Sequence, residues 1–214
     1  TCGSGGMILT NDDRLRYHSS LFLDKCYQRD EGIRNPFFLA PNYQMTELQG
    51  AVALAQLEKV EQIVAARSRL GVLLDGFLKQ IPGVTSQRTP EGCRHGYFLY
   101  LFKLDLDRLR CTSQEFAEAL SAEGVPSKAR LITGGMPVYQ YRIFQDRSAF
   151  PGSEFPLAGR VYGKGDCPVA EGAFDRWITM NIYEHYTETD MREIAHCVGK
   201  VAHHFSRVPA GAKG

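Results

Sequence analysis

The sequence has little of what marks membrane, secreted or nucleic-acid-binding proteins. It contains no apolar run of about 18 residues, so we expect no transmembrane helix, and no charged-then-apolar segment typical of a signal peptide. The net charge is only +1 and no block of Lys or Arg occurs. The charge pattern therefore gives no reason to expect nucleic acid or a membrane as a partner. These absences predict a cytoplasmic protein.

Signatures of metal sites and of several enzyme classes are missing as well. The six cysteines form no C-x-x-C pair, so we expect reduced thiols rather than a disulfide framework or a metal site. His196, His203 and His204 lie off the apolar stripe of the last predicted helix, where they are expected to be solvated. No G-x-S-x-G, H-E-x-x-H or P-loop pattern occurs, which removes the usual starting points for a hydrolase or a nucleotide-driven motor.

What is present indicates a folded α/β chain of one large domain or parts of two. Hydrophobic residues make up 43% of the 214 residues, enough for a sizeable core. Met7–Thr10 is predicted as a buried strand, although the next thirty or so residues offer it no neighbouring strand. Thr46 and Gln49 form a capping box that begins a helix running to Ile81, before Pro82-Gly83 and with a kink near Gly71.

The remaining pattern predicts a small α+β domain from about residue 84. Strands are expected at 97–104, 125–131 and 177–183, and Thr112 and Thr187 are expected to cap two helices. The last helix has one clean apolar face, formed by Met191, Ile194, Ala195, Val198, Val201, Ala202 and Phe205. Residues 132–168 are expected to form a long surface loop that reaches a cleft, and the tail from residue 209 is expected to be disordered.

Three groups of residues are candidates for binding, each with a structural alternative. The glycine-rich turn containing Gly3 and Gly5 either presents backbone N–H groups to an anion or is an ordinary turn. Asn42, just before a helix start, either holds a phosphate through its amide or is a turn residue. A third group either binds an anionic or polyhydroxy substrate or belongs to a mixed polar loop: Tyr139, Tyr141, Arg142 and Arg147.

The order of these motifs resembles the DegT/DnrJ/EryC1/StrS family of pyridoxal-phosphate-dependent sugar aminotransferases of fold type I. The resemblance rests on Thr1-x-Gly3-x-Gly5-Gly6-Met7-Ile8-Leu9-Thr10-Asn11-Asp12-Asp13, Asn42-Tyr43-x-Met45-Thr46-Glu47-Leu48-Gln49-x-Ala51 and Ala55-Gln56-Leu57. Weaker similarities in Phe38-Leu39-Ala40-Pro41 and Pro137-Val138-Tyr139 point to the branch that acts on inososes and aminohydroxybenzoate precursors.

The resemblance implies the C-terminal part of such an enzyme. Residues 1–66 would end the large cofactor-binding domain and begin the interdomain helix, residues 67–208 would form the small α+β domain, and residues 209–214 the tail. The lysine that forms the Schiff base with the cofactor would precede Thr1, so no catalytic residue is assigned in this chain. The resemblance further implies a homodimer with shared sites, in which Asn42 bonds the cofactor phosphate of the neighbouring subunit.

The resemblance also implies roles for individual residues, and it leaves three alternative activities. Gly3 and Gly5 are expected to bind the cofactor, and Tyr43, Gln44 and Tyr139 the substrate. Ser4 and Gln44 stand where the family usually has Glu and a cation. The resemblance implies transfer of an amino group from glutamate or glutamine to a keto-sugar or keto-cyclitol. The alternatives are a sugar dehydratase of the same family and a non-catalytic dimerisation or carbohydrate-binding domain.

Overall fold

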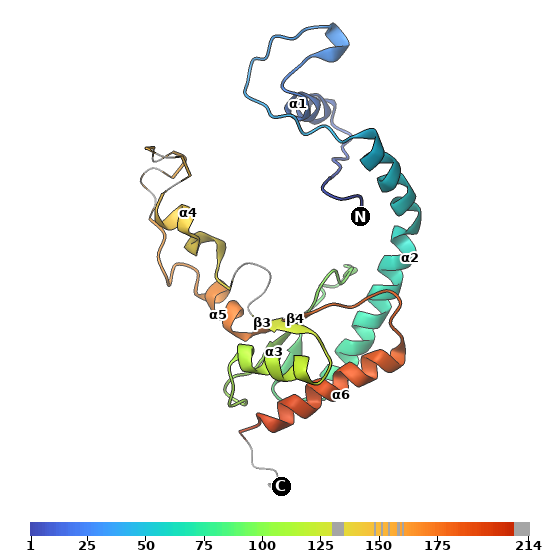
Figure 1. Ribbon diagram of the computed structural model, residues 1–214, viewed down its shortest axis with the longest axis vertical. Helices are drawn as coiled ribbons and strands as arrows, with labels where there is room; N and C mark the ends of the chain where they lie inside the picture. The colour runs from blue at the N-terminus through green and yellow to red at the C-terminus, as the bar shows by residue number, and fades with distance from the viewer. Residues whose placement is uncertain are drawn as a thin grey trace. The chain divides into compact units, whose positions relative to one another are not determined.

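The computed structural model divides the chain into two compact units, 1–62 and 63–214 (Figure 1). It describes residues 1–129, 135–147, 149–150, 152–153, 155–157, 159 and 161–207. The predicted tail 209–214 lies outside these residues. The division between the units falls within the long helix α2, Glu47–Leu78. The assignment of residues 1–66 and 67–208 to a large and a small domain stays a prediction.

The first unit contains helix α1, Asp13–Leu23, the short 3-10 helix η1, Arg29–Glu31, and the N-terminal half of α2. Asp12 caps α1 through its carboxylate, which accepts from the N–H groups of Arg14 and Leu15. The strand predicted at Met7–Thr10 is not formed, and Met7 and Leu9 are 78% and 87% exposed. A strand needs a hydrogen-bonded neighbour, which an apolar run alone does not provide.

The helix α2 begins as predicted and ends three residues earlier than predicted. Gln49 N–H donates to Thr46 Oγ1 at 3.3 Å while Gln49 Oε1 accepts from the Thr46 N–H at 3.1 Å, which is the expected capping box. After Leu78 the backbone tightens, because Ile81 precedes Pro82 and the α conformation is disfavoured there. Ile81 N–H donates to Leu78 O at 3.0 Å, a turn of the 3-10 type.

The second unit is built on a four-stranded antiparallel sheet in the order β1-β2-β4-β3. The strands are β1, Val84–Ser86; β2, Tyr100–Leu104; β3, Ser127–Ala129; and β4, Trp177–Met180. The strand predicted at 97–104 thus begins at Tyr100, three residues later than predicted. Tyr97 adopts a left-handed backbone with φ of 44°, which breaks the extended run, and Phe98 is 78% exposed. Arg130 and Leu131, at the end of the predicted strand 125–131, lie outside the described residues.

Helices α3, Ser113–Ala122, and α6, Glu188–His204, pack against each other and complete the core (Figure 1). Thr112 and Thr187 cap these helices as predicted, each in a capping box, and Gly124 has the left-handed φ of 92° expected after a helix end. The core joins alternate residues of β2 to the C-terminal half of α2 and to the predicted face of α6. Its most buried members include Leu70, Leu74, Leu78, Tyr100, Phe102, Phe116, Met191 and Val198.

The segment between β3 and β4 contains η2, Val138–Gln140, α4, Arg142–Gln145, and α5, Pro168–Arg176. The described residues of the predicted loop 132–168 thus include two short helical pieces. Helix α5 contacts β2 and β3. Because Tyr100, Phe102 and Leu104 point into the core, the alternate residue Leu101 is left to face the groove beside α5.

Candidate functional site

The Asn42 loop is a fixed turn rather than a free connection. Lys25 N–H donates to Pro41 O at 2.9 Å and Tyr43 N–H donates to Leu23 O at 2.8 Å, so the loop pairs with the end of α1. The Asn42 Oδ1 accepts from the Gln44 N–H at 3.4 Å, a long contact of the Asx-turn kind. Because Oδ1 is the acceptor in this turn, the Nδ2 hydrogens are the donors that Asn42 offers to a ligand.

The glycine-rich turn lies against the same loop. Gln49, at the start of α2, donates through Nε2 to Ser4 O at 3.0 Å. A Cβ placed on Gly5 would lie 2.9 Å from Met45 Cε, so this position is too close to the loop for a side chain without a shift of Met45. Gly3 has φ of 88°, a conformation that favours glycine. The structure therefore brings together the two motifs that the sequence separates by about forty residues.

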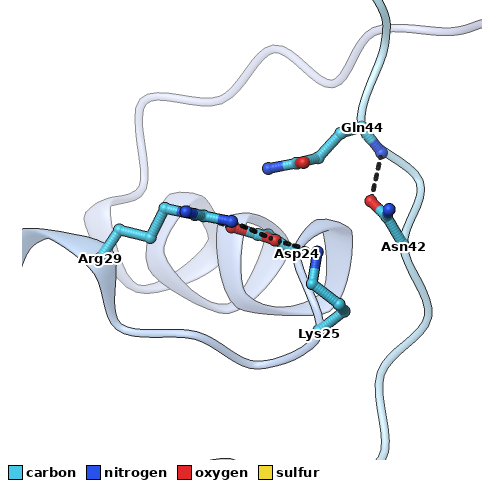
Figure 2. Close-up of polar contacts among 5 residues, drawn as sticks. All are labelled: Asp24, Lys25, Arg29, Asn42 and Gln44. Atoms are coloured by element: carbon cyan, nitrogen blue, oxygen red, sulfur yellow. Dashed lines mark hydrogen bonds and ion pairs between the residues drawn. The ribbon is translucent and has the colours of Figure 1, made fainter. Parts of the chain in front are cut away.

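A cluster of charges adjoins Asn42, as Figure 2 shows. Asp24 is only 5% exposed and pairs with Asn42 in an isolated antiparallel bridge. Its carboxylate accepts from Lys25 Nζ at 2.7 Å and from both Nε and Nη2 of Arg29, the latter at 3.0 Å. The hydrogen bonds from Arg29, then from Lys25, hold the pKa of Asp24 well below its usual range. A buried carboxylate thus fixes two cations beside the Asn42 loop.

The backbone at this cluster is unusual. Lys25 and Cys26 are consecutive non-glycine residues with left-handed φ of 56° and 58°. Each such residue is disfavoured by about 1 kcal/mol or more. Cys26 is fully buried and its N–H donates to Leu21 O at 2.7 Å, so packing holds the turn. The ring of Tyr27 lies 5.4 Å from Lys25 Nζ and 5.9 Å from the Arg29 guanidinium, within cation–π range.

The substrate candidate Tyr139 lies in the second unit, in an apolar groove of about 690 Å³. Leu101 of β2, Phe174 of α5 and the rings of Phe144 and Tyr162 line this groove with it. The Tyr139 hydroxyl donates to Glu171, which also accepts from the Gly165 N–H at 2.6 Å. The bond from Tyr139 lowers the pKa of Glu171, while burial and this bond raise the pKa of Tyr139.

Arg142, one of the arginines predicted near Tyr139, is not among the residues that line this groove. Arg142 is 91% exposed along its side chain and pairs with Asp146 at 2.6 Å, which favours the polar-loop interpretation for this residue. The histidines at 196, 203 and 204 are exposed, as expected. Among the described residues, no group of three or more His, Cys, Asp or Glu side chains is placed to hold a metal ion. Over the same residues, each helix is too short or too polar to span a bilayer.

Sequence reasoning missed Asp24, Lys25 and Arg29. Their spacing around the aromatic Tyr27 was a usable signal, since it places two cations near one acid and one ring. Only the left-handed turn at Lys25 and Cys26 shows that these groups converge beside Asn42.

The described residues thus combine a small α+β unit, the long helix α2 that precedes it in the chain, and an Asn42 loop joined to a glycine turn. The model of the DegT/DnrJ/EryC1/StrS aminotransferase family matches residues 1–199, and this chain belongs to that family. Membership of the family indicates pyridoxal 5'-phosphate as the cofactor.

Three similar proteins illustrate the relationship. The chain is 33% identical to GDP-perosamine synthase of Caulobacter vibrioides over 60% of this chain and 34% of that protein. It is 27% identical to a putative L-glutamine:3-amino-2,3-dideoxy-scyllo-inosose aminotransferase of Streptoalloteichus tenebrarius, over 94% of this chain and 50% of the relative. The structure of Helicobacter pylori PseC, an aminotransferase involved in the biosynthesis of pseudoaminic acid, shares the fold with a TM-score of 0.69 at 21% identity. That match covers 92% of this chain and 48% of PseC. The chain spans about half the length, or less, of the curated relatives it matches.

The residues of the first unit fit the phosphate end of the cofactor. Asn42 offers amide donors, the Gly3–Gly5 turn has no bulky side chains at its glycines, and the adjoining charge cluster is cationic. A phosphate needs donors and positive charge at close approach; Asn42 supplies donors, the cluster supplies charge, and the glycine turn offers backbone N–H groups.

Proposed function

We propose that this chain is the C-terminal portion of a pyridoxal-phosphate-dependent aminotransferase that moves an amino group from glutamate or glutamine to a keto-sugar or keto-cyclitol. The observation that carries the proposal is the junction of the glycine turn with the Asn42 loop, through the Gln49–Ser4 hydrogen bond, in a chain of this family. The Schiff-base lysine would be supplied by the region before Thr1, since none of the eight lysines here occupies the corresponding position.

The chain's own residues would bind and orient rather than react. When bound, the pyridoxal ring supplies the electron sink for the transfer of a proton between carbon atoms. Asn42 would donate its Nδ2 hydrogens to the phosphate, and the turn of Gly3 and Gly5 would present backbone N–H groups to it. Because these contacts involve the phosphate and not the reacting carbon, they fix the position of the ring.

The substrate side of the proposal rests on Tyr43, Gln44 and Tyr139. Tyr43 is 66% exposed, and its ring lies 6.1 Å from that of Phe22, which limits its movement. Gln44 presents an amide, which suits hydroxyl groups of a sugar or cyclitol better than an anion. The names of the two curated relatives, a perosamine synthase and an inosose aminotransferase, support this substrate class.

The proposed assembly is a homodimer in which Asn42 reaches the cofactor of the neighbouring subunit. The first unit leaves most of its large apolar side chains exposed, more than an isolated soluble domain usually shows. We infer that the region before Thr1 and a second copy together cover this surface. Its members include Met7, Ile8, Leu9, Phe37, Leu39, Leu48, Leu54 and Leu57.

Two alternatives make different predictions. A dehydratase of the same family would carry histidine in place of the lysine and would remove water from the sugar without transferring nitrogen. A non-catalytic dimerisation or carbohydrate-binding domain is favoured by Ser4 and Gln44, which replace residues usual in the family. The identity of the residue encoded shortly before Thr1 separates lysine-based from histidine-based chemistry.

The test begins with the 214-residue chain and pyridoxal phosphate, followed by borohydride reduction and mass spectrometry. We expect no stoichiometric adduct at a single lysine; such an adduct would contradict the assignment of the catalytic lysine to the preceding region. The polypeptide that includes this region is then assayed with ¹⁵N-labelled glutamate or glutamine and keto-sugars. Transfer of ¹⁵N supports the aminotransferase, loss of water supports the dehydratase, and neither reaction from a stable dimer supports the non-catalytic domain.

A further inference from the structure

We propose that Lys25 is a phosphate-binding residue, positioned by Asp24 so that its ammonium group and the Asn42 amide bind one phosphoryl group together. This inference rests on the proposed function, because it assigns a further residue to the same phosphate site. The ligand chemistry is a phosphate monoester or diester, supplied by the cofactor or by a nucleotide-linked sugar.

The backbone sets Lys25 beside Asn42. Asp24 and Asn42 are bridge partners, and the Lys25 N–H donates to Pro41 O at 2.9 Å, one residue before Asn42. Figure 2 shows Lys25 on the side of Asp24 that faces the Asn42 loop, and Arg29 on the other side. The two segments therefore present one cation and one amide along a single short length of paired backbone.

The two cations of the cluster contact the Asp24 carboxylate in different ways. Arg29 binds the Asp24 carboxylate through Nε and Nη2, and this two-point contact fixes its orientation. Lys25 contacts the same carboxylate through one of its three N–H donors, at 2.7 Å, and its side chain is 35% exposed. Lys25 can therefore turn donors toward a second acceptor while Asp24 keeps its bonds to Arg29.

The local charge favours an anion. Two cations face one carboxylate in the cluster, which leaves one unit of positive charge beside Asn42. The side chains of Asn42 and Gln44 are neutral. Asp30 and Glu31 of η1 keep their negative charges, and the Glu31 carboxylate accepts from Gln28 Nε2 at 3.3 Å, so the excess positive charge belongs to the Asp24 ion pairs themselves. A phosphate with a charge near −2 at neutral pH is bound more strongly by an ammonium and an amide than by an amide alone.

The experiment follows the Asn42 side-chain amide by NMR in the ¹⁵N-labelled 214-residue chain during titration with inorganic phosphate. We compare wild type with Lys25→Met, which removes the charge and keeps the length, with Lys25→Arg, and with Lys59→Met as a control elsewhere in the first unit. The spectra also report folding, through the amide of Cys26 in the buried turn. Pyridoxal phosphate, pyridoxal and a nucleoside diphosphate sugar are then titrated separately.

We expect saturable shifts of the Asn42 amide with phosphate, a loss of affinity of about tenfold in Lys25→Met, partial recovery in Lys25→Arg and no change in Lys59→Met. Tighter binding of pyridoxal phosphate than of the diphosphate sugar assigns the phosphate to the cofactor, and the reverse assigns it to the substrate. Equal affinity in wild type and a folded Lys25→Met, no response of the wild-type Asn42 amide to phosphate, or equal binding of pyridoxal and pyridoxal phosphate overturns the proposal. Phosphate binding that depends on Lys25 would stand even if no amino transfer is found.

Discussion

The ring of Tyr97 occupies the space that a side chain at Gly71 would need. A Cβ built on Gly71 lies 2.4 Å from Tyr97 Cε2, far inside van der Waals contact. The ring cannot withdraw easily, because it is 1% exposed, its hydroxyl donates to Asp75 at 3.0 Å and it stacks on Tyr100 at 5.6 Å. The glycine predicted to kink the helix thus serves close packing in α2.

This contact predicts opposite effects for two glycines of the same helix. Gly71→Ala should lower the free energy of unfolding by about 1–3 kcal/mol, because the methyl group overpacks the site. Gly76→Ala should raise it by about 0.5–1 kcal/mol, since a Cβ there meets no atom within 4 Å and alanine favours the helix. Urea unfolding of both variants tests the pair; similar effects in both would contradict the packing role of Gly71.

The same tyrosines predict a loss of stability at high pH. Burial, then Asp75, raises the pKa of Tyr97 to about 12, and burial raises that of Tyr100 further. Their neutral forms are favoured in the folded state, so this contribution is complete below the usual tyrosine pKa of about 10 and decreases as the pH rises through the folded value. Urea midpoints of wild type should fall between about pH 10 and pH 12.

Replacing one phenol isolates this effect. In Tyr97→Phe the midpoint should be lower at pH 8 and should fall less steeply toward pH 12 than in wild type. Ultraviolet titration of the folded chain should show tyrosines that ionise late, Tyr97 and Tyr100 among them. An unchanged slope in Tyr97→Phe would show that Tyr97 ionisation does not govern the alkaline transition.

Asp24 predicts the reverse pH dependence in the first unit. Its pKa is lowered by Arg29 and Lys25, so its contribution is present above the usual carboxylate pKa of about 4 and is lost as the pH falls toward the folded value. Hydrogen exchange of the Cys26 amide should therefore accelerate relative to intrinsic rates below about pH 4. Asp24→Asn should abolish this change, whereas Asp13→Asn should retain it, because Asp13 forms only an exposed pair with Arg16 at 3.8 Å.

In the proposed dimer, Asn42→Asp should weaken the affinity for pyridoxal phosphate by about tenfold or more, because a carboxylate replaces amide donors next to the proposed phosphate site. Asn11→Asp adds the same charge at another exposed position of the first unit and should leave the affinity unchanged. Fluorescence titration with pyridoxal phosphate measures both. Equal losses in the two variants would point to overall charge rather than to a contact of Asn42.

The local signals in the sequence were the dependable ones. The capping boxes at Thr46, Thr112 and Thr187 all form, because a cap depends on residues three positions apart. The apolar face of α6 was likewise predicted, since its period is a property of the helix alone. The strand predicted at Met7–Thr10 does not form, because a strand needs a hydrogen-bonded neighbour and the apolar run does not reveal whether one exists.

The candidate site was predictable only in part. Asn42 and the glycine turn were found from motif order, and the structure adds that Gln49 and Met45 bring them together. The cluster of Asp24, Lys25 and Arg29 depends on two left-handed residues, a conformation that most residue types adopt rarely. Ordinary propensities therefore predict no reversal at that point, and the convergence on Asn42 emerges only in three dimensions.

The sheet of the second unit has one further consequence. The chain leaves it at Ala129 and returns at Trp177, yet β3 and β4 lie side by side, with Ser127 opposite Met180. The described residues between these points include the Tyr139 groove wall and helix α5, which also contacts β2 and β3. The entropic cost of closing a loop rises only slowly with its length, so the segment between β3 and β4 can be long without greatly destabilising the sheet. We therefore expect residues inserted or deleted in its exposed parts to cost the sheet little stability.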